Sequence, residues 1–449
     1  MIKHVLEVVE NSFLFGIFIK MELASGIHYM MAKEANILPA VVRLYNMESM
    51  NKCILTTVCL FLFLMGCDVT HQEKLYCIDI ESAMSYMQTI FVSDLGENVN
   101  YIPLETTDSS LIGNRPYIRK FRNTLLVASE KQPIMMFTIE NGKFIKTIGN
   151  IGHGGNEYIL SYDRPVFWTD KNEQYIFVKS AEEKIQQYDS LGNYVGTVKL
   201  PEDIGPLSGL SQITIDDYIY FYRNYLFDEQ EYKITKVNYN TRQIESTITG
   251  NQKAVHPEFI GNLIIFPGFG GIPVSPTCLI HQMKNNCMAF NYMEDPCLWN
   301  YNGETYFKKR FNDTIYQIKD KWLQPHYIFD LGNKQIPYDE RFKTEGMLDK
   351  ISIEYILESP KALFFMFKTN HFHIEPNIYW GVYNKLTHEV KISDKHQIKD
   401  ENNGYVIEEM HTATSDGEII GLVSVERYME LSRNKQMGSD DNPIAVILE

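Results

Sequence analysis

Short runs of alternating apolar and polar residues fill most of the chain beyond about residue 99. Strand-like runs include Leu125–Val127, Phe144–Ile148 and Tyr175–Lys179, and turn-forming groups such as Glu140-Asn141-Gly142 separate them. A period of two residues is typical of half-buried β-strands, and Asn-Gly pairs supply the positive φ that tight hairpins require. The pattern therefore predicts an all-β protein.

Consecutive segments that begin near Tyr117, Pro165 and Gln212 share one plan. Each holds four short strands in roughly 45–50 residues; the first reads YIRKF, NTLLVAS, IMMFTI and NGKFIKTIG. Four-stranded units at this period are typical of β-propeller blades. An array of two β-sandwich domains is the alternative, and it would lack the repeating four-strand period.

Further strand-like runs continue the plan less regularly through the second half and raise the expected total to six blades. They are Cys297–Phe307, Thr314–Ile318, Tyr327–Leu331, Ile351–Leu357, Ala362–Lys368, Ile378–Tyr383, Val390–Ser393, Tyr405–Thr414 and Ile419–Ser424. A short helix is expected at 426–434 and a final strand at Pro443–Leu448. The segment Val99–Glu105 could add a strand to the last blade and so close the ring.

The apolar run Cys53–Met65 is 13 residues long, carries no charge and follows Lys52. It is too short to span a bilayer but suits the core of a signal peptide. Gly66 then precedes Cys67, whose thiol could carry a lipid, and two or three acyl chains make a durable anchor. A short buried helix with an incidental cysteine is the alternative.

These features divide the chain into four parts. Residues 1–49 are interpreted as sequence translated from an upstream start codon, because Met47 and Met50 are better starts; a real N-terminal extension is the alternative. Residues 50–66 are the expected signal peptide, 67–90 a tether or linker, and 91–449 the six-bladed β-propeller. The part after residue 66 keeps the net charge of −15, because residues 1–66 hold five basic and five acidic residues.

Composition narrows the classes of function. An acidic surface repels phosphate backbones, so we expect no nucleic-acid partner. No CxxC or other metal spacing occurs, and we expect no cofactor. Cys278, Cys287 and Cys297 lie close in sequence, so one pair could form a disulfide; buried free thiols are the alternative.

Few residues stand out for chemistry. His371 and His373 would lie about 6.6 Å apart on one side of an extended segment and could share a metal ion; solvated loop histidines are the alternative. The glycines between Gly149 and Gly155 lack the Lys-Ser/Thr pair of a phosphate loop, so they indicate a tight crossover between blades. No spacing marks a catalytic nucleophile or acid pair, and we name no catalytic residue.

Several stretches resemble the six-bladed β-propeller lipoproteins of the Bacteroidetes, a family related to NHL- and TolB-like propellers. The main one is Asn141–Tyr158, which departs from the family pattern at Gly155, where Pro is usual, and at Asn156, where Gly is usual. Further matching stretches are Tyr101–Glu105, Asn312–Tyr316, Pro325–Gly332 and Asp441–Val446. The resemblance covers nearly all of residues 50–449, and it implies the propeller fold, export, and lipidation of Cys67.

In such exported proteins, Asp-Ser-Leu at 189–191 and Asp-Thr-Ile at 313–315 match an O-glycosylation pattern, which makes Ser190 and Thr314 candidates. The expected location is the cell envelope, with the outer membrane favoured. The expected function is a scaffold or binding module for a protein or glycan ligand. The alternatives are a hydrolase or lyase that acts on an extracellular polymer at the channel mouth, and an envelope sensor.

Overall fold

The computed structural model describes residues 75–160, 163–265, 277–293, 295–373, 376–432, 438 and 440–449. These residues form an all-β fold of mostly four-stranded antiparallel sheets, as the alternating pattern predicts. The expected signal peptide 50–66, its lipidation site Cys67 and the segment 1–49 lie outside the described residues.

Three sheets in the first half follow the repeat units that the sequence predicts. Their strands are β4 (Tyr117–Phe121), β5 (Thr124–Ala128), β6 (Ile134–Thr138) and β7 (Phe144–Ile148); β10 (Val166–Thr169), β11 (Tyr175–Ser180), β12 (Lys184–Asp189) and β13 (Tyr194–Val198); and β14 (Ser211–Ile215), β15 (Tyr218–Asn224), β16 (Gln230–Asn238) and β17 (Gln243–Asn251). Within each sheet, the strands lie side by side in sequence order, and neighbouring strands are antiparallel.

The second half adds three more sheets of this kind within the described residues. Their strands are β21 (Leu298–Tyr301), β22 (Glu304–Lys308), β23 (Thr314–Ile318) and β24 (Leu323–Asp330); β25 (Ser352–Glu358), β26 (Ala362–Thr369), β27 (Asn377–Asn384) and β28 (Val390–Ser393); and β31 (Glu409–Ala413), β32 (Ile419–Val423) and β33 (Ile444–Leu448). Strand β3 (Val99–Pro103) pairs with β33 as the fourth strand of the last of these sheets.

Other elements lie between or beside these sheets. A three-stranded sheet follows β17, with β18 (Phe259–Ile265), β19 (Thr277–Met283) and β20 (Cys287–Met293). The smaller pairings join β2 (Ile90–Phe91), β29 (Ile398–Lys399) and β30 (Val406–Ile407), and β8 (Asn150–Ile151) with β9 (Glu157–Tyr158). The helices are α3 (Ile80–Ala83), α4 (Val425–Ser432), and the 3₁₀ turns η1 (Val92–Asp94), η2 (Glu202–Ile204), η3 (Gly332–Lys334) and η4 (Tyr338–Glu340).

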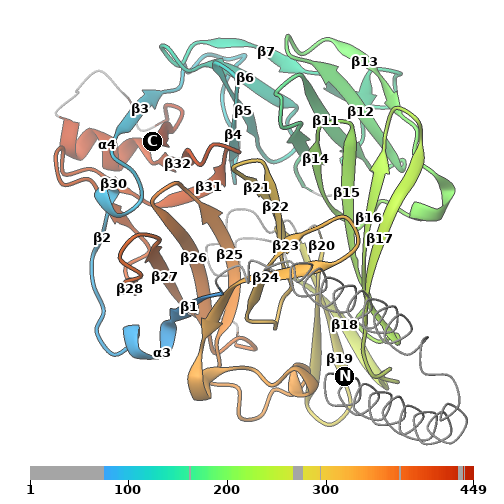
Figure 1. The fold of residues 1–449 in the computed structure, drawn as a ribbon. Helices are drawn as coiled ribbons and strands as arrows, with labels where there is room; N and C mark the ends of the chain where they lie inside the picture. The colour runs from blue at the N-terminus through green and yellow to red at the C-terminus, as the bar shows by residue number, and fades with distance from the viewer. Residues whose placement is uncertain are drawn as a thin grey trace, which may run out of the picture. The chain divides into compact units, whose positions relative to one another are not determined.

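The expected linker at 67–90 is folded over part of its length. Strand β1 (Tyr76–Asp79) adds in parallel to the outer edge of β24, and α3 follows it. Ile78, Ile80 and Ile90 are fully buried, and Figure 1 shows these blue elements among the orange and red ones. Any linker must therefore end before Tyr76.

The first strands of the four-stranded sheets lie against one another. Strand β31 contacts β4 and β25, and β14 contacts β10 and β21. Because β14 contacts β21 directly, the sheet β18–β20 lies outside this series (Figure 1). The sequence pattern did not predict that sheet, which is an insertion between two repeat units.

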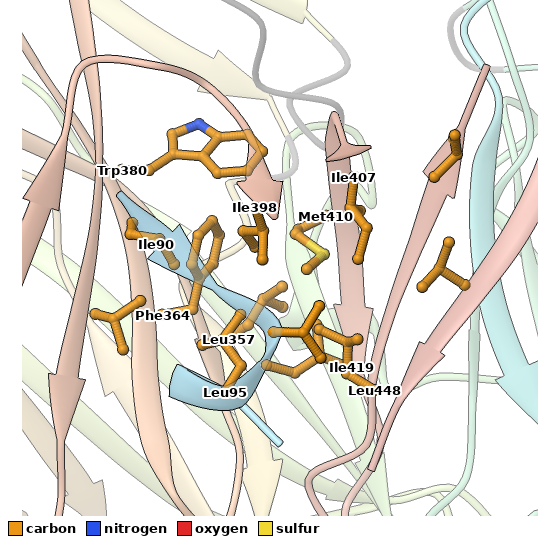
Figure 2. Close-up of a cluster of buried hydrophobic side chains, with 14 of the residues drawn as sticks. Ile90, Leu95, Leu357, Phe364, Trp380, Ile398, Ile407, Met410, Ile419 and Leu448 are labelled. Atoms are coloured by element: carbon orange, nitrogen blue, oxygen red, sulfur yellow. The ribbon is translucent and has the colours of Figure 1, made fainter. Parts of the chain in front are cut away.

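The core lies between neighbouring sheets. One cluster joins the sheets that contain β25 and β31 to the N-terminal segment, and Figure 2 shows Ile90 and Leu95 beside Phe364 and Ile398. Similar clusters lie between other neighbouring sheets. Burial of these apolar faces, at about 25 cal/mol per Å², is the main stabilising term for such a layered fold.

The segment between β7 and β10 forms the tight crossover that its glycines predict. Strands β8 and β9 pair in parallel, and the carboxylate of Glu157 accepts the Gly154 amide at 2.8 Å. The fully buried Tyr158 hydroxyl donates to the Ile148 carbonyl at 3.2 Å and accepts the Ile134 amide at 3.0 Å. These hydrogen bonds fasten the crossover to the sheet β4–β7.

Cys278, Cys287 and Cys297 are free thiols, so the disulfide that their spacing allowed is not formed. Burial raises the pKa of Cys278 to about 12 and that of Cys297 well above its ordinary value. Both thiols stay protonated at neutral pH and act as small apolar side chains in the packing.

Candidate functional site

A cavity of about 120 Å³ lies where the first strands of the four-stranded sheets converge. Each of β4, β10, β14, β21, β25 and β31 contributes to its wall. We call it the central cavity. Its lining includes Tyr117, Arg119, Trp168, Asp170, Gln212, Leu298, Trp299, Asn300, Tyr355, Glu358 and Thr412.

Two tryptophans form aromatic walls of the central cavity. Trp168 in β10 stacks on Phe177, and its indole N–H donates to the Thr214 hydroxyl. Trp299 in β21 stacks on Tyr306, and its indole N–H donates to a Glu358 carboxylate oxygen at 2.8 Å. Because stacking and a hydrogen bond hold each ring, both faces are in place before a ligand binds.

Two polar groups in this lining have unused hydrogen-bonding capacity. Arg119 donates through Nη2 to the Tyr117 hydroxyl at 3.2 Å, but its buried Nε has no partner among the described residues. Asn300 donates through Nδ2 to the Thr214 carbonyl at 3.5 Å, while its buried Oδ1 has no partner there either. An unpaired buried donor and acceptor cost free energy that a polar ligand could recover.

The carboxylates in the lining are already engaged in the fold. Asp170 accepts the backbone amides of Gln174 and Tyr175 at 2.8 and 2.6 Å, which holds the β10–β11 turn. Glu358 accepts from Trp299 and pairs with Lys385 at 2.8 Å. Glu173, the third carboxylate of the described lining, accepts the Arg122 amide at 2.8 Å. Burial raises the pKa of Asp170, and the hydrogen bonds from the backbone amides, which lower it, do not offset this effect. These acids position the wall and leave no obvious pair for acid–base catalysis in the described lining.

A second cavity of about 120 Å³ continues from the central one and shares Tyr117, Arg119 and Trp168 with it. Its wall adds Arg164, Ser211 and Asp295. The guanidinium of Arg164 lies 5.1 Å from the centre of the Tyr117 ring, and burial lowers its pKa to about 10. Arg164 therefore stays charged at neutral pH, and this end of the cavity is more basic.

Near this end, His411 sits at a bulge of β31, where the register with β32 shifts. Its Nε2 lies 2.9 Å from a Glu409 carboxylate oxygen, and burial lowers the pKa of the imidazole. The ring is fully buried and contributes to neither cavity wall. A histidine that a substrate cannot touch acts here as a structural group.

The structure separates the two histidines of the predicted metal site. His371 is fully buried, 4.6 Å from the Phe290 ring centre, whereas His373 is exposed in the turn after β26. Among the described residues, no three His, Cys, Asp or Glu side chains group as metal ligands. The next residues, 374 and 375, lie outside the described part, so the metal site stays a prediction.

The glycosylation candidates lie in different settings. Ser190 is in the β12–β13 turn beside the exposed Leu191. Thr314 is the first residue of β23, and the Asp313 carboxylate before it accepts a hydrogen bond from Gln335. Asp313 thus has a structural role, and both modifications stay predictions.

Sequence reasoning did not identify the cavity residues. A usable signal was present: the first strands of the first two repeat units read YIRKF and PVFWTD, and they supply Arg119 and Trp168. First strands surround the axis of a propeller, so polar and aromatic residues on them are candidates for a central site.

Comparison with known proteins agrees with this architecture. A crystal structure of a presumed exported protein from Bacteroides fragilis NCTC 9343 aligns with a TM-score of 0.55 at 15% identity, covering 83% of this chain and 99% of that one. Structures of U3-55K and of RRP9 WD40 repeats align with TM-scores of 0.35 and 0.36, at 10% and 9% identity, covering 78% and 81% of this chain and 98% and 99% of theirs. Those two scores carry no argument about the fold.

Among curated proteins, none matches this sequence. No helix within the described residues is long and apolar enough to cross a membrane. A profile of the family described as "Domain of unknown function (DUF4934)" matches residues 75–449, a range that includes every residue the structure describes. The chain therefore belongs to the DUF4934 family.

Proposed function

We propose that this protein is an exported, lipid-anchored β-propeller that binds a protein or glycan ligand at the cell envelope. The signal-peptide pattern at 50–66, with Cys67 directly after it, supports export and lipidation. The similar Bacteroides fragilis protein is also described as exported.

The proposed fold is one ring of six blades. Support comes from the contacts between first strands and from the central cavity, whose wall takes residues from β4, β10, β14, β21, β25 and β31. In this arrangement, the pairing of β3 with β33 joins the two ends of the chain in one blade and closes the ring. A closed ring leaves no exposed sheet edge inside the propeller.

The central cavity is the proposed binding site. The observation that carries this proposal is the combination of two fixed indole faces, Trp168 and Trp299, with buried groups on Arg119 and Asn300 that have no partner in the described part of the chain. Aromatic faces pack on the apolar faces of sugars or side chains, and a few placed polar groups fix the orientation of a ligand. A short glycan fits this lining best.

Tryptophan fluorescence tests the proposal, because two of the chain's four tryptophans line the cavity. Titration with a panel of oligosaccharides should change the emission of the wild-type protein for at least one of them. Trp299→Phe should remove most of that change, and Asn300→Ala should weaken binding about tenfold, the effect of losing one hydrogen bond to a ligand.

Trp322→Phe is the matched control, because Trp322 is 54% exposed in the β23–β24 turn and does not line the cavity. This variant should keep both the emission change and the affinity. An emission change that Trp322→Phe abolishes and Trp299→Phe retains would place the ligand elsewhere and reject the central cavity.

Lipidation of Cys67 has its own test. Wild-type protein should sediment with membranes, and mass spectrometry of its N-terminus should find an acylated Cys67. Cys67→Ser should move the protein to the soluble fraction, because the acyl chains are lost. Cys77→Ser is the control, since Cys77 lies in β1 within the fold. A native chain that carries Met1–Asn46 would contradict the proposed signal peptide.

The alternative of a polymer hydrolase or lyase has weaker support. It needs a catalytic acid or base that faces the cavity. The lining carboxylates Asp170, Glu173 and Glu358 are engaged in hydrogen bonds or ion pairs of the fold, and His411 is shielded. Binding without turnover accounts better for this set of residues.

A further inference from the structure

A third cavity, of about 40 Å³, lies between the insertion sheet β18–β20 and the segments that follow β13 and β22. Its wall includes Lys309, Arg310 and Arg341, and Asp295 is the one carboxylate among the described residues of this wall. We call it the basic pocket. It shares Ser211 and Asp295 with the second cavity, so it adjoins the proposed binding site.

Two residues of the basic pocket, Lys309 and Arg310, belong to a run of three buried basic residues. Lys308, Lys309 and Arg310 follow one another at the end of β22, and each is no more than 9% exposed. Lysine and arginine are rarely buried without partners, because desolvation of a charge costs several kcal/mol. Three such residues in succession, in a chain with a net charge of −15, call for a specific reason.

Carboxylates compensate these cations incompletely. Arg310 donates through Nε to Asp295 at 2.9 Å and through Nη1 to Glu354, which also lies 3.5 Å from the Lys368 amine. The remaining Nη2 of Arg310 is buried and has no partner among the described residues. Both N–H groups of this nitrogen are therefore left over.

Arg341 supplies a second guanidinium. Unlike Arg310, it has no carboxylate in hydrogen-bond contact within the described residues. It donates to the Tyr338 carbonyl at 2.8 Å and to the Gln252 side-chain oxygen at 2.7 Å. The negative charge of Asp339 raises the pKa of Arg341, but the Asp339 side chain is exposed to solvent. Lys309, in contrast, pairs with Glu231 and with the Tyr338 hydroxyl. Desolvation by burial lowers the pKa of Lys309 to about 6, so this amine is largely neutral at pH 7. Within the described residues, Arg341 is therefore the charged group of the pocket wall that no carboxylate contacts through a hydrogen bond.

Aromatic rings hold the cations in place. The Arg310 guanidinium lies 3.5 Å from the Tyr292 ring centre, and the Arg341 guanidinium lies 4.0 Å from that of Tyr338. Stacked guanidinium planes are fixed in orientation and suit planar anions, which they bind through paired N–H groups. The volume of the pocket suits a group of a few atoms.

We infer that the basic pocket binds the carboxylate of an acidic sugar, which narrows the ligand class of the proposed function and rests on it. The sugar ring would lie toward the second cavity, and its carboxylate would accept hydrogen bonds from Arg341 and from the Nη2 of Arg310, which has no partner among the described residues. The acidic surface of the protein repels anions at long range, so selection must come from these local contacts.

Calorimetric titration of the full-length protein tests this inference with four probes: D-glucuronate, its methyl ester, D-glucose and inorganic phosphate. Glucuronate should bind about tenfold tighter than the ester or glucose, since a hydrogen bond to a charged group is stronger than one to a neutral group. Equal affinity for the acid and its ester would overturn the inference. Phosphate binding as tight as that of glucuronate would also overturn it, because the pocket would then be a general anion site.

Two variants test whether the basic pocket causes the preference for glucuronate over its methyl ester. Arg341→Gln should remove the preference for the acid over the ester, and Lys343→Gln should keep it, because Lys343 is exposed and lies outside the pocket. Thermal melting checks that both variants fold. If Arg341→Gln does not fold, the affinities of the wild-type protein for the acid and the ester still decide whether the inference holds.

The two proposals fail in different ways. If Trp299→Phe abolishes binding of neutral oligosaccharides while glucuronate keeps its preference, both proposals stand. If neutral oligosaccharides bind at the central cavity but glucuronate has no advantage, only the basic pocket is rejected. If no saccharide binds at all, the proposed function itself is rejected.

Discussion

A chain that begins at Leu104 should not fold, whereas a chain that begins at Lys74 should melt as the full-length protein does. The shorter chain lacks β1, α3, β2, η1 and β3. It thereby loses six apolar side chains that are at most 5% exposed: Ile78, Ile80, Ile90, Val92, Leu95 and Ile102. Burial of such side chains contributes about 1.5–3 kcal/mol each, or about 9–18 kcal/mol together, against a total stability of about 5–15 kcal/mol for a typical protein.

Thermal melting and circular dichroism of the two chains check this expectation. The chain from Lys74 is the control, because it removes residues 1–73 and keeps every described element. Ile102→Ala in full-length protein should cost about 2–5 kcal/mol, the effect of one large-to-small change in a core. A cooperative transition in the chain from Leu104 would show that the N-terminal strands are accessory to the fold.

Glu354→Gln should lower the free energy of unfolding by about 3–5 kcal/mol, the cost of removing one partner from a buried ion pair. The Glu354 side chain is 1% exposed and faces Arg310, Lys368, His371 and the Ser352 hydroxyl. Its neutral replacement would leave Arg310 with Asp295 alone and Lys368 with the Tyr292 hydroxyl. Urea denaturation at pH 7 measures the difference.

The pH dependence gives a second readout for the same change. Burial raises the pKa of Glu354, but the nearby Arg310 and Lys368 outweigh it, so the pKa lies well below its ordinary value. A carboxyl with a depressed folded-state pKa stabilises the protein above its unfolded-state value, about 4.3, and loses that effect as the pH falls. The gap between wild type and Glu354→Gln should therefore narrow below about pH 4.

Glu340→Gln is the matched control, because Glu340 pairs with Lys343 on the surface and is 42% exposed. Exposed pairs of this kind contribute little, so no measurable change in stability is expected. If Glu354→Gln is as stable as the wild type, the buried cluster of charges does not hold the sheets that contain β22 and β25 together.

The regular repeat units could be predicted from sequence because each blade pairs strands that are neighbours in the chain. Phe144–Ile148, Thr314–Ile318 and Val390–Ser393 match β7, β23 and β28 as predicted. Strands β1 and β2 were missed because their partners, β24 and β29, lie hundreds of residues away. A local period carries no information about such pairings.

The candidate site was harder to predict, for a related reason. The basic pocket joins residues near 222, 292, 310 and 341, and the insertion sheet β18–β20 that forms part of its wall interrupts the repeat. The run Lys308-Lys309-Arg310 was visible, but charged runs are usually solvated, and only burial makes this one unusual. The family resemblance implied the propeller and the export signal, and it carried no information on these residues.

The pairing of β3 with β33 also has a consequence for how the chain is made. Val99 pairs with Leu448, so one of the first strands to be synthesised must wait for almost the last one. At about 5–20 residues per second, that wait lasts roughly 20–70 seconds, and contacts so distant in sequence slow folding further. During this time β3 exposes unpaired backbone, which can aggregate. The nascent chain therefore passes through a vulnerable stage in which a chaperone would have its largest effect.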